Sequence, residues 1–217
     1  MNKREVAMRI ARYSETLDKL NWISRWNAMV EKTDAPMLHD RNALFPFLDD
    51  KLGPDPITYL EFGVQRGNSM RKWVGLNQHP DSTFHGFDTF EGLPEDWNAR
   101  WPKGSFSTNG VTPDIDDPRV KFHKGLFQDT LRPFLAEQGE FGSRLVINMD
   151  ADLYSSTLYV LCELDRVMPA GTVILFDEFQ SYLHEFRAWH DYSTAYGRTF
   201  TFLGFALGGV NGAVELT

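Results

Sequence analysis

The chain has 217 residues, of which 42% are hydrophobic and 24% charged, and its formal net charge is −8. This length and composition suit a single globular domain spanning residues 1–217, while the acidic balance argues against partners that demand a basic surface, namely nucleic acid and anionic lipid. The N-terminus lacks the apolar run of a signal peptide, and no apolar stretch is long enough to cross a membrane. We therefore expect a cytoplasmic protein whose partners do not include nucleic acid or membranes.

Two helices are predicted before the first strong strand. Residues 3–31 carry apolar side chains at helical spacings of three and four, namely Val6, Ile10, Tyr13, Leu17 and Leu20. Residues 44–52 form a second helical stretch that ends at a Gly-Pro pair. We interpret residues 1–53 as a helical cap or lid on a catalytic core of residues 54–217. These helices could cover one edge of the core, close over the site, or pair with a second subunit to form a homo-oligomer.

From residue 57 onward, strand and helix patterns alternate. The strand patterns lie at 58–62, 83–88, 120–124, 145–149, 172–176, 199–205 and 212–216, with helical patterns at 69–76, 128–137, 156–167 and 182–196. This alternation predicts an α/β fold with a largely parallel sheet, in which ligands bind outside the carboxyl ends of the strands. Residues 91–118 carry four prolines and no clear period, so we expect this long loop to be a functional flap or disordered.

Glycines bracket the turn after the strand at 58–62. Gly63 and Gly67 let the backbone turn tightly and approach a ligand, and the following helix presents free N–H groups at its start. The spacing is Gly-x-x-x-Gly, which differs from the Gly-x-Gly-x-x-Gly of dinucleotide-binding folds. It therefore favours S-adenosylmethionine over NAD, although a plain strand-to-helix turn would look the same.

The next two strand ends could hold the rest of a nucleoside. Asp88, with Thr89 beside it, directly follows its strand, where an acidic residue can accept the hydroxyls of a ribose. Phe127 and Gln128 follow the third strand, and an aromatic ring with an amide could stack on adenine and hydrogen-bond to it. The alternatives are a solvated loop aspartate and ordinary packing at the start of a helix.

Carboxylates gather after the last two parallel strands. Asp150 and Asp152 follow one apolar strand, and Asp177 and Glu178 follow the next. If these strands are neighbours, Asp150, Asp177 and Glu178 converge, and such a group cannot stay ionised without a cation. Oxygen ligands of this kind suit Mg²⁺ or another divalent cation. Acidic residues that are merely solvated at a sheet edge or cap helices are the simpler alternative.

These strand ends, in this order, resemble the macrocin-type O-methyltransferases, which tailor sugars on macrolides and other natural products. The likeness runs from about residue 58 to residue 179. It is carried by Leu60-Glu61-Phe62-Gly63-Val64 with Gly67, Gly86-Phe87-Asp88-Thr89-Phe90-Glu91-Gly92-Leu93-Pro94, Lys124-Gly125-Leu126-Phe127-Gln128-Asp129-Thr130-Leu131 and Asp150-Ala151-Asp152-Leu153-Tyr154.

The resemblance implies a Rossmann-like class I methyltransferase fold, with a mostly parallel seven-stranded sheet, helices on both faces and extra N-terminal helices. It implies cofactor contacts from Glu61, Gly63 and Ser69 to the methionine part, from Asp88 to ribose, and from Phe127 and Gln128 around adenine. Asp150, Asp177 and Glu178 match the metal positions, although the family commonly has two adjacent aspartates at the last pair. Leu153 stands where catechol-type enzymes carry a lysine base.

The predicted reaction is metal-assisted methyl transfer from S-adenosylmethionine to a hydroxyl of a small molecule. A metal bound to that hydroxyl would lower its pKa, and Asp150 or Asp152 could then take the proton. Two other functions stay open at this point, which are a metal-independent methyltransferase with structural carboxylates and a cofactor-binding module without catalysis. A nicotinamide-dependent dehydrogenase is disfavoured by the glycine spacing.

Overall fold

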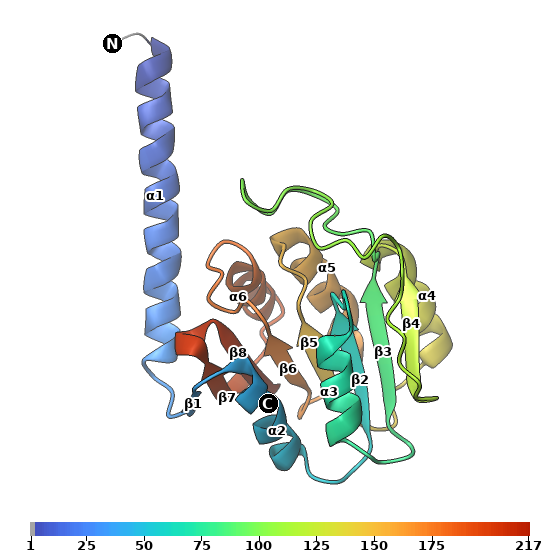
Figure 1. The fold of residues 1–217 in the computed structure, drawn as a ribbon. Helices are drawn as coiled ribbons and strands as arrows, with labels where there is room; N and C mark the ends of the chain where they lie inside the picture. The colour runs from blue at the N-terminus through green and yellow to red at the C-terminus, as the bar shows by residue number, and fades with distance from the viewer. Residues whose placement is uncertain (1–2) are drawn as a thin grey trace.

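A mixed eight-stranded sheet organises residues 3–217, the part of the chain that the computed structural model describes (Figure 1). The strands lie in the order β1-β7-β8-β6-β5-β2-β3-β4. Their bounds are β1 Met37–Leu38, β2 Ile57–Phe62, β3 Thr83–Asp88, β4 Val120–Lys124, β5 Arg144–Met149, β6 Val173–Phe176, β7 Phe200–Ala206 and β8 Asn211–Leu216. All pairs are parallel except the two that β8 makes with β6 and β7.

The α/β fold with a largely parallel sheet is confirmed, and the closing pair of strands lies where the sequence predicts it. The predicted count of seven strands is exceeded by one, because the short strand β1 adds beside β7 at one edge. Its two residues are too few to give a sequence pattern. The central strands β2, β5 and β6 are buried along nearly their whole length, as expected for parallel strands that are covered on both faces.

Helices cover the two faces of this sheet. Their bounds are α1 Lys3–Val30, α2 Arg41–Leu52, α3 Asn68–Leu76, α4 Phe127–Gln138, α5 Tyr154–Leu164 and α6 Glu185–Ala195. Residues of α2 and α3 share one apolar cluster with the sheet, and residues of α4, α5 and α6 share the other. The helix α2 begins at Arg41, three residues before the predicted start, because Asp40 caps it by accepting a hydrogen bond from the Ala43 backbone N–H. This early start places Arg41 at the carboxyl edge of the sheet.

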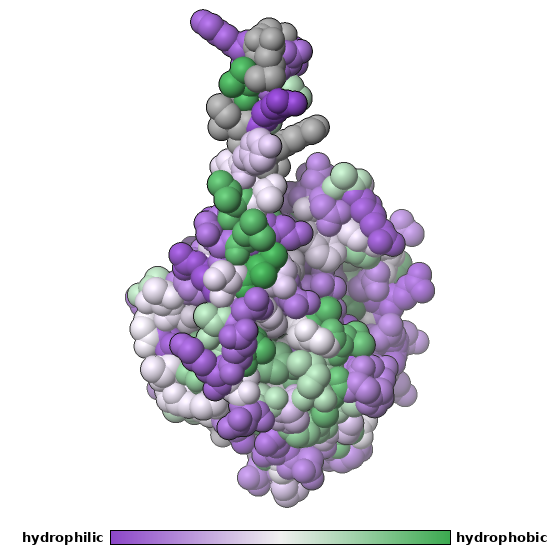
Figure 2. Space-filling model, turned by 90° about the vertical axis from the view of Figure 1, so that its left-hand side faces the viewer, coloured by the Kyte–Doolittle hydropathy of each residue, from purple (hydrophilic) through white to green (hydrophobic). Residues whose placement is uncertain are grey.

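The first helix divides into a packed half and a projecting half (Figure 1). Trp22 and Trp26 are buried, and both rings contact the ring of Phe186 on α6 edge to face. The other half extends away from the body of the molecule, with apolar side chains along it (Figure 2). Of the predicted apolar face, Val6, Tyr13, Leu17 and Leu20 are exposed, and the side chain of Ile10 lies outside the described residues. No helix in the described part of the chain is long and apolar enough to span a membrane.

Candidate active site

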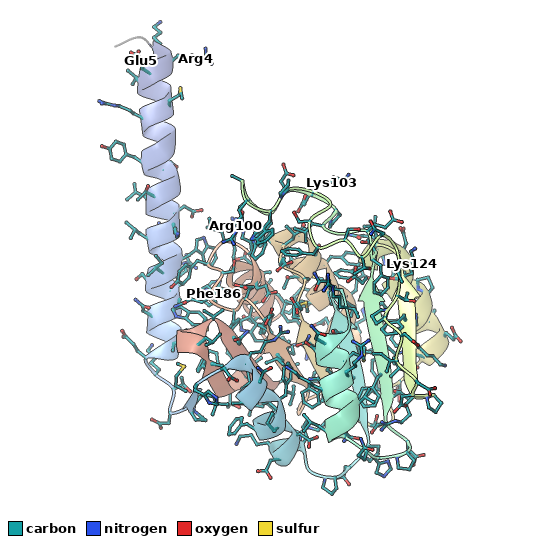
Figure 3. The ribbon with its side chains drawn as sticks, viewed as in Figure 1. Arg4, Glu5, Arg100, Lys103, Lys124 and Phe186 are labelled. Carbon is teal, nitrogen blue, oxygen red and sulfur yellow. The ribbon has the colours of Figure 1, made fainter. Side chains whose placement is uncertain are left out.

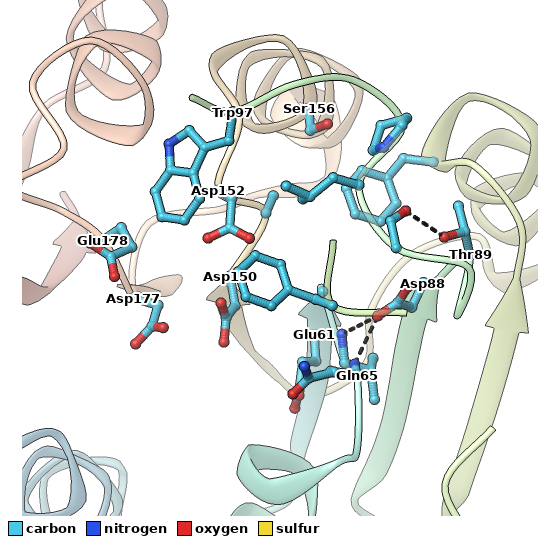
Figure 4. A pocket seen from close by; sticks show the side chains of 18 of the residues that line it. Glu61, Gln65, Asp88, Thr89, Trp97, Asp150, Asp152, Ser156, Asp177 and Glu178 are labelled. Carbon is cyan, nitrogen blue, oxygen red and sulfur yellow. Dashed lines mark hydrogen bonds between the residues drawn. The ribbon is translucent and has the colours of Figure 1, made fainter. Parts of the chain in front are cut away.

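A cavity of about 460 Å³ lies at the carboxyl ends of β2, β3, β5 and β6 (Figure 4). Its volume is within the range of ordinary small-molecule sites. Of the predicted site residues, those that line it are Glu61, Gly63, Ser69, Asp88, Thr89, Phe127, Gln128, Asp150, Asp152, Asp177 and Glu178. Gly67 does not line it; it precedes α3 in a left-handed conformation that favours glycine. Residues predicted at the ends of five strands, β2, β3, β4, β5 and β6, thus meet in one place.

Gly63 allows the ends of β2 and β5 to approach each other closely. A Cβ at this position would lie 1.8 Å from the backbone oxygen of Asp150, and the glycine φ of +91° is also unfavourable for other residues. The backbone N–H of Asp150 in turn donates to the oxygen of Phe62 at 2.9 Å. The glycine predicted to approach the cofactor therefore also brings the acidic strand end beside the turn.

Asp88 fastens the turn after β2 to the end of β3. Its Oδ2 accepts hydrogen bonds from the backbone N–H groups of Val64 and Gln65, both at 2.8 Å, and its Oδ1 accepts one from Phe90 at 2.7 Å (Figure 4). Each carboxylate oxygen can accept about two bonds, so Oδ1, which accepts only the bond from Phe90, can still receive a ribose hydroxyl. Thr89 likewise organises the backbone, because its hydroxyl donates to the Gly92 oxygen at 3.1 Å.

Glu61 lies at the floor of the cavity and is 1% exposed. The hydroxyl of Tyr59 donates to its Oε2 at 2.8 Å. Burial raises the pKa of Glu61 to about 8, and the charge of Asp150 raises it further against the opposing effects of Tyr59 and Arg41. A buried carboxyl group of this kind favours a cationic partner, and the ammonium group of a methionine moiety is one.

Arg41 bridges the ends of β5 and β6. Its Nη2 lies 2.9 Å from Oδ2 of Asp150, and its Nε lies 2.7 Å from Oδ1 of Asp177. The same Nη2 donates to the hydroxyl of Ser69 at 3.2 Å. Burial alone would lower the pKa of Arg41, but the two carboxylates raise it above its ordinary value. No sequence pattern predicted this contact, since Arg41 lies outside every predicted motif and reaches the site only through the fold.

The acidic side of the cavity holds more negative charge than Arg41 balances. Burial raises the pKa of Asp177 to about 8, and Asp150 adds to this rise although Arg41 opposes it. Burial likewise raises the pKa of Asp152 to about 8, with Asp150 and Glu178 adding to it. A further cation in this region would therefore be stabilised by the side chains around it. Asp150, Asp177 and Glu178, the three acids predicted to cluster, face the same side of the cavity (Figure 4).

The predicted three-carboxylate metal group is not assembled as the side chains stand. Among residues 3–217, no three His, Cys, Asp or Glu side chains are placed to hold a metal ion together. Two of the three predicted ligands, Asp150 and Asp177, converge on a single cation, and that cation is the guanidinium group of Arg41. Glu178 lines the same cavity, whereas the two ion pairs of Arg41 are made to Asp150 and Asp177.

Two residues far along the chain orient the acidic loop after β6. Asn211, the first residue of β8, donates from Nδ2 to Oδ1 of Asp177 at 2.8 Å. The wholly buried Glu185, at the start of α6, accepts from the backbone N–H of Glu178 at 2.9 Å. Sequence reasoning missed both residues, because neither belongs to a motif. They fix the backbone from which Asp177 and Glu178 project.

The loop at residues 91–118 contributes a wall of the cavity, and its role as a functional flap stays a prediction. Trp97, Trp101 and Phe106 line the cavity, and the last two rings lie 4.7 Å apart. The loop is tied to the start of α5, since Ser155 Oγ donates to Oε1 of Glu95 at 2.5 Å. Its basic side chains Arg100 and Lys103 lie at the outer side of the molecule (Figure 3).

The aromatic end of the cavity lies at the start of α4. The ring of Phe127 packs edge to face against Phe62, with centroids 5.4 Å apart. Gln128 is exposed at the rim and lines the cavity beside it. An aromatic face and an amide are therefore available together, as expected for a heterocyclic base.

Residues 53–200 match the family model described as macrocin-O-methyltransferase (TylF). Among solved structures, the O-methyltransferase NovP is similar with a TM-score of 0.62 and 20% identity, covering 82% of this chain and 79% of that one. The calicheamicin methyltransferase CalS11 has a TM-score of 0.60 and 21% identity, covering 80% and 76%. The structure of cmcI-D160 with Mg and SAM has a TM-score of 0.56 and 17% identity, covering 82% and 72%. No curated protein sequence matches.

Proposed function

The chain belongs to the macrocin-O-methyltransferase family of S-adenosylmethionine-dependent enzymes, and from this premise we propose that it methylates a hydroxyl of a sugar or glycosylated natural product with the help of a divalent cation. The description of one similar protein, CalS11, supports the acceptor class, since its two structures call it a calicheamicin methyltransferase and a TDP-rhamnose 3'-O-methyltransferase. The observation that carries the proposal is the convergence of Glu61, Asp88 and Asp150 on one cavity.

The methyl donor would be held along the β2 and β3 strand ends. Glu61 offers a buried carboxyl group for the ammonium of the methionine part, and Ser69 offers a hydroxyl beside it. Asp88 would accept the ribose hydroxyls while it holds the turn after β2. Phe127 and Gln128 would flank the adenine. These assignments place the sulfonium near the middle of the cavity, beside the acidic strand ends.

The carboxylate side of the cavity suits a divalent cation. Asp150 and Asp177 already converge on one positive group, and the pKa of Asp177 is raised to about 8 by burial and by Asp150 even in its presence. Carboxylate oxygens are the ligands that Mg²⁺ prefers. We propose Asp150, Asp177 and Glu178 as its ligands. The similar structure of cmcI-D160 contains Mg. When bound, the metal would orient an acceptor hydroxyl and lower its pKa.

The protein's own residues then align the acceptor and accept its proton. In the transfer, the acceptor oxygen forms a bond to the methyl carbon while the carbon–sulfur bond breaks, and the hydroxyl proton passes to a carboxylate. We assign the proton to Asp152, because burial raises its pKa to about 8, which makes its ionised form a stronger proton acceptor than an ordinary aspartate. Trp97 and Trp101 would hold the acceptor and exclude water.

The test is methyl transfer from labelled S-adenosylmethionine to a panel of nucleotide sugars and glycosides, in Mg²⁺ and in excess EDTA. We expect transfer to a sugar hydroxyl that EDTA abolishes and Mg²⁺ restores. Binding of S-adenosylmethionine, measured by calorimetry, should survive EDTA. Full activity in EDTA would reject the metal while leaving the methyltransferase in place.

The ion pairs of Arg41 favour a second candidate, which is a metal-independent methyltransferase. In that enzyme the guanidinium group would take the place of the metal and polarise the acceptor hydroxyl. The raised pKa of Asp177 weighs against it, because one guanidinium leaves the surrounding acids incompletely balanced. Activity in EDTA separates the two candidates directly.

We also propose that a second copy of the chain covers the projecting half of α1. Tyr13, Leu17 and Leu20 are 71%, 61% and 54% exposed and follow one another at spacings of four and three, which puts them on one helical face. Light scattering would report a dimer, and Leu17→Glu should convert it to a monomer. A wild-type monomer at micromolar concentration would reject this proposal.

A further inference from the structure

Arg41 is the side chain that connects the N-terminal helices with the chemistry of the site. It is the first residue of α2, and the cap by Asp40 fixes where that helix begins. Its guanidinium group contacts Asp150 just after β5, Asp177 just after β6, and Ser69 in α3. The side chain keeps 27% of its surface exposed, so it can turn toward the open cavity.

The backbone behind Arg41 is fixed even though its side chain has room. Leu44, Phe45 and Leu48 of α2 are at most 1% exposed and pack in the apolar cluster under the sheet. A movement of the whole helix would expose these apolar side chains to water, which is unfavourable. Any exchange of partners at Arg41 must therefore occur by rotation of its side chain.

One position between Asp150 and Asp177 cannot hold two cations. Arg41 approaches Oδ2 of Asp150 and Oδ1 of Asp177 at 2.9 and 2.7 Å, and a metal ligated by both residues would need the same gap. Two positive groups within about 4 Å repel each other, and the repulsion grows as the surroundings exclude water. A divalent cation and the guanidinium group are thus alternatives at this point.

We infer that Arg41 is the internal counter-ion of the metal-free enzyme, and that it competes with the divalent cation for Asp150 and Asp177. This inference rests on the proposed metal site. When the metal is absent, Arg41 keeps the two carboxylates together and the strand ends in place. When the metal binds, the guanidinium group leaves them, with the hydroxyl of Ser69 as the partner that remains within reach. Metal affinity is therefore set partly by a residue that is not a ligand.

The experiment compares Mg²⁺ binding to wild type and to Arg41→Gln by calorimetry, without cofactor or acceptor. We expect the variant to bind Mg²⁺ about tenfold more tightly or better, because no cation has to be displaced. Thermal unfolding gives a second readout: the variant should be destabilised in EDTA, and Mg²⁺ should raise its Tm more than that of wild type. Arg132→Gln is the matched control, since it removes an arginine from an exposed carboxylate pair with Glu163.

The outcomes separate this inference from the function on which it rests. Equal or weaker Mg²⁺ binding by Arg41→Gln would overturn the competition while leaving the metal site intact. No Mg²⁺ binding by either protein would reject both the metal and the competition. If Arg41→Gln does not fold in EDTA, Arg41→Lys replaces it, because an ammonium group cannot bridge the two acids as a guanidinium does. For Arg41→Lys, tighter Mg²⁺ binding than wild type supports the inference even if the gain is smaller than the one expected for Arg41→Gln. Mg²⁺ binding equal to that of wild type overturns it.

Discussion

The two ends of the cavity hold their acidic residues by different physical means. At one end, Asp88 accepts hydrogen bonds from three backbone N–H groups that lie close to it along neighbouring strands. At the other end, Asp150 and Asp177 depend on a full positive charge from Arg41, a residue from outside the parallel core. We call these the amide-held end and the charge-held end.

The difference indicates a division of labour. An acid that is satisfied by fixed amides has a defined position before any ligand arrives, which suits recognition of a cofactor. Acids that are crowded around one guanidinium group favour any further cation, which suits chemistry that needs positive charge. We therefore expect changes at the charge-held end to affect turnover and changes at the amide-held end to affect cofactor affinity.

The largest effect is expected from Asp177→Asn at the charge-held end. The substitution keeps the shape of the side chain but removes the charge that we assign to metal binding, so kcat should fall by about 10³-fold. The Kd for S-adenosylmethionine should change less than about threefold, since Asp177 is not among its proposed contacts. Steady-state kinetics and calorimetry measure the two quantities. A variant that loses cofactor binding as well would erase the distinction between the two ends.

Glu61→Gln, between the two ends, should raise stability while weakening cofactor binding. The folded protein keeps Glu61 protonated up to its pKa of about 8, whereas the unfolded chain releases that proton near its ordinary pKa. Wild-type stability therefore falls, relative to the variant, as pH rises from about 4.5 to about 8, by as much as about 3 kcal/mol at pH 7. Urea unfolding of both proteins at pH 5 and pH 8, without ligands, tests this. A constant difference between them would contradict the buried protonated carboxyl.

Asp88→Asn tests the amide-held end. An amide has only one acceptor oxygen, so the side chain must give up either the bonds from Val64 and Gln65 or the bond from Phe90. We expect the Kd for S-adenosylmethionine to rise by about 30-fold. This change corresponds to the loss of one or two charge-assisted hydrogen bonds. The turnover at saturating cofactor should remain within about threefold of wild type. Asp129→Asn, an exposed acid at the start of α4, serves as the control.

Trp97→Ala in the loop wall should have the smallest effect. We expect the KM for the acceptor to rise by about tenfold through lost stacking, with the cofactor Kd unchanged. Trp97 also packs edge to face on His184, with ring centroids 6.1 Å apart, so Trp97→Phe should recover most of the loss. An unchanged acceptor KM in the alanine variant would show that the wall does not contact the acceptor.

The same contrast explains what the sequence could predict. The amide-held end depends on the turns that follow the neighbouring strands β2 and β3, whose glycines and strand-end acid have recognisable spacing. The charge-held end depends on Arg41 and Asn211, which approach from opposite ends of the chain and belong to no motif. The strand ends and their acids were predictable for this reason, whereas the partners of those acids were not. The short strand β1 was missed because two residues carry no period.

The position of β8 has a consequence for how the enzyme is made. This strand lies inside the sheet between β6 and β7, and its first residue, Asn211, donates to Asp177. During synthesis, β6 would lack one neighbour and Asp177 one donor until β8 has emerged from the ribosome. A nonsense mutation anywhere between the codons for β6 and β8 should therefore yield an inactive polypeptide for chaperones and proteases, not a weakened enzyme.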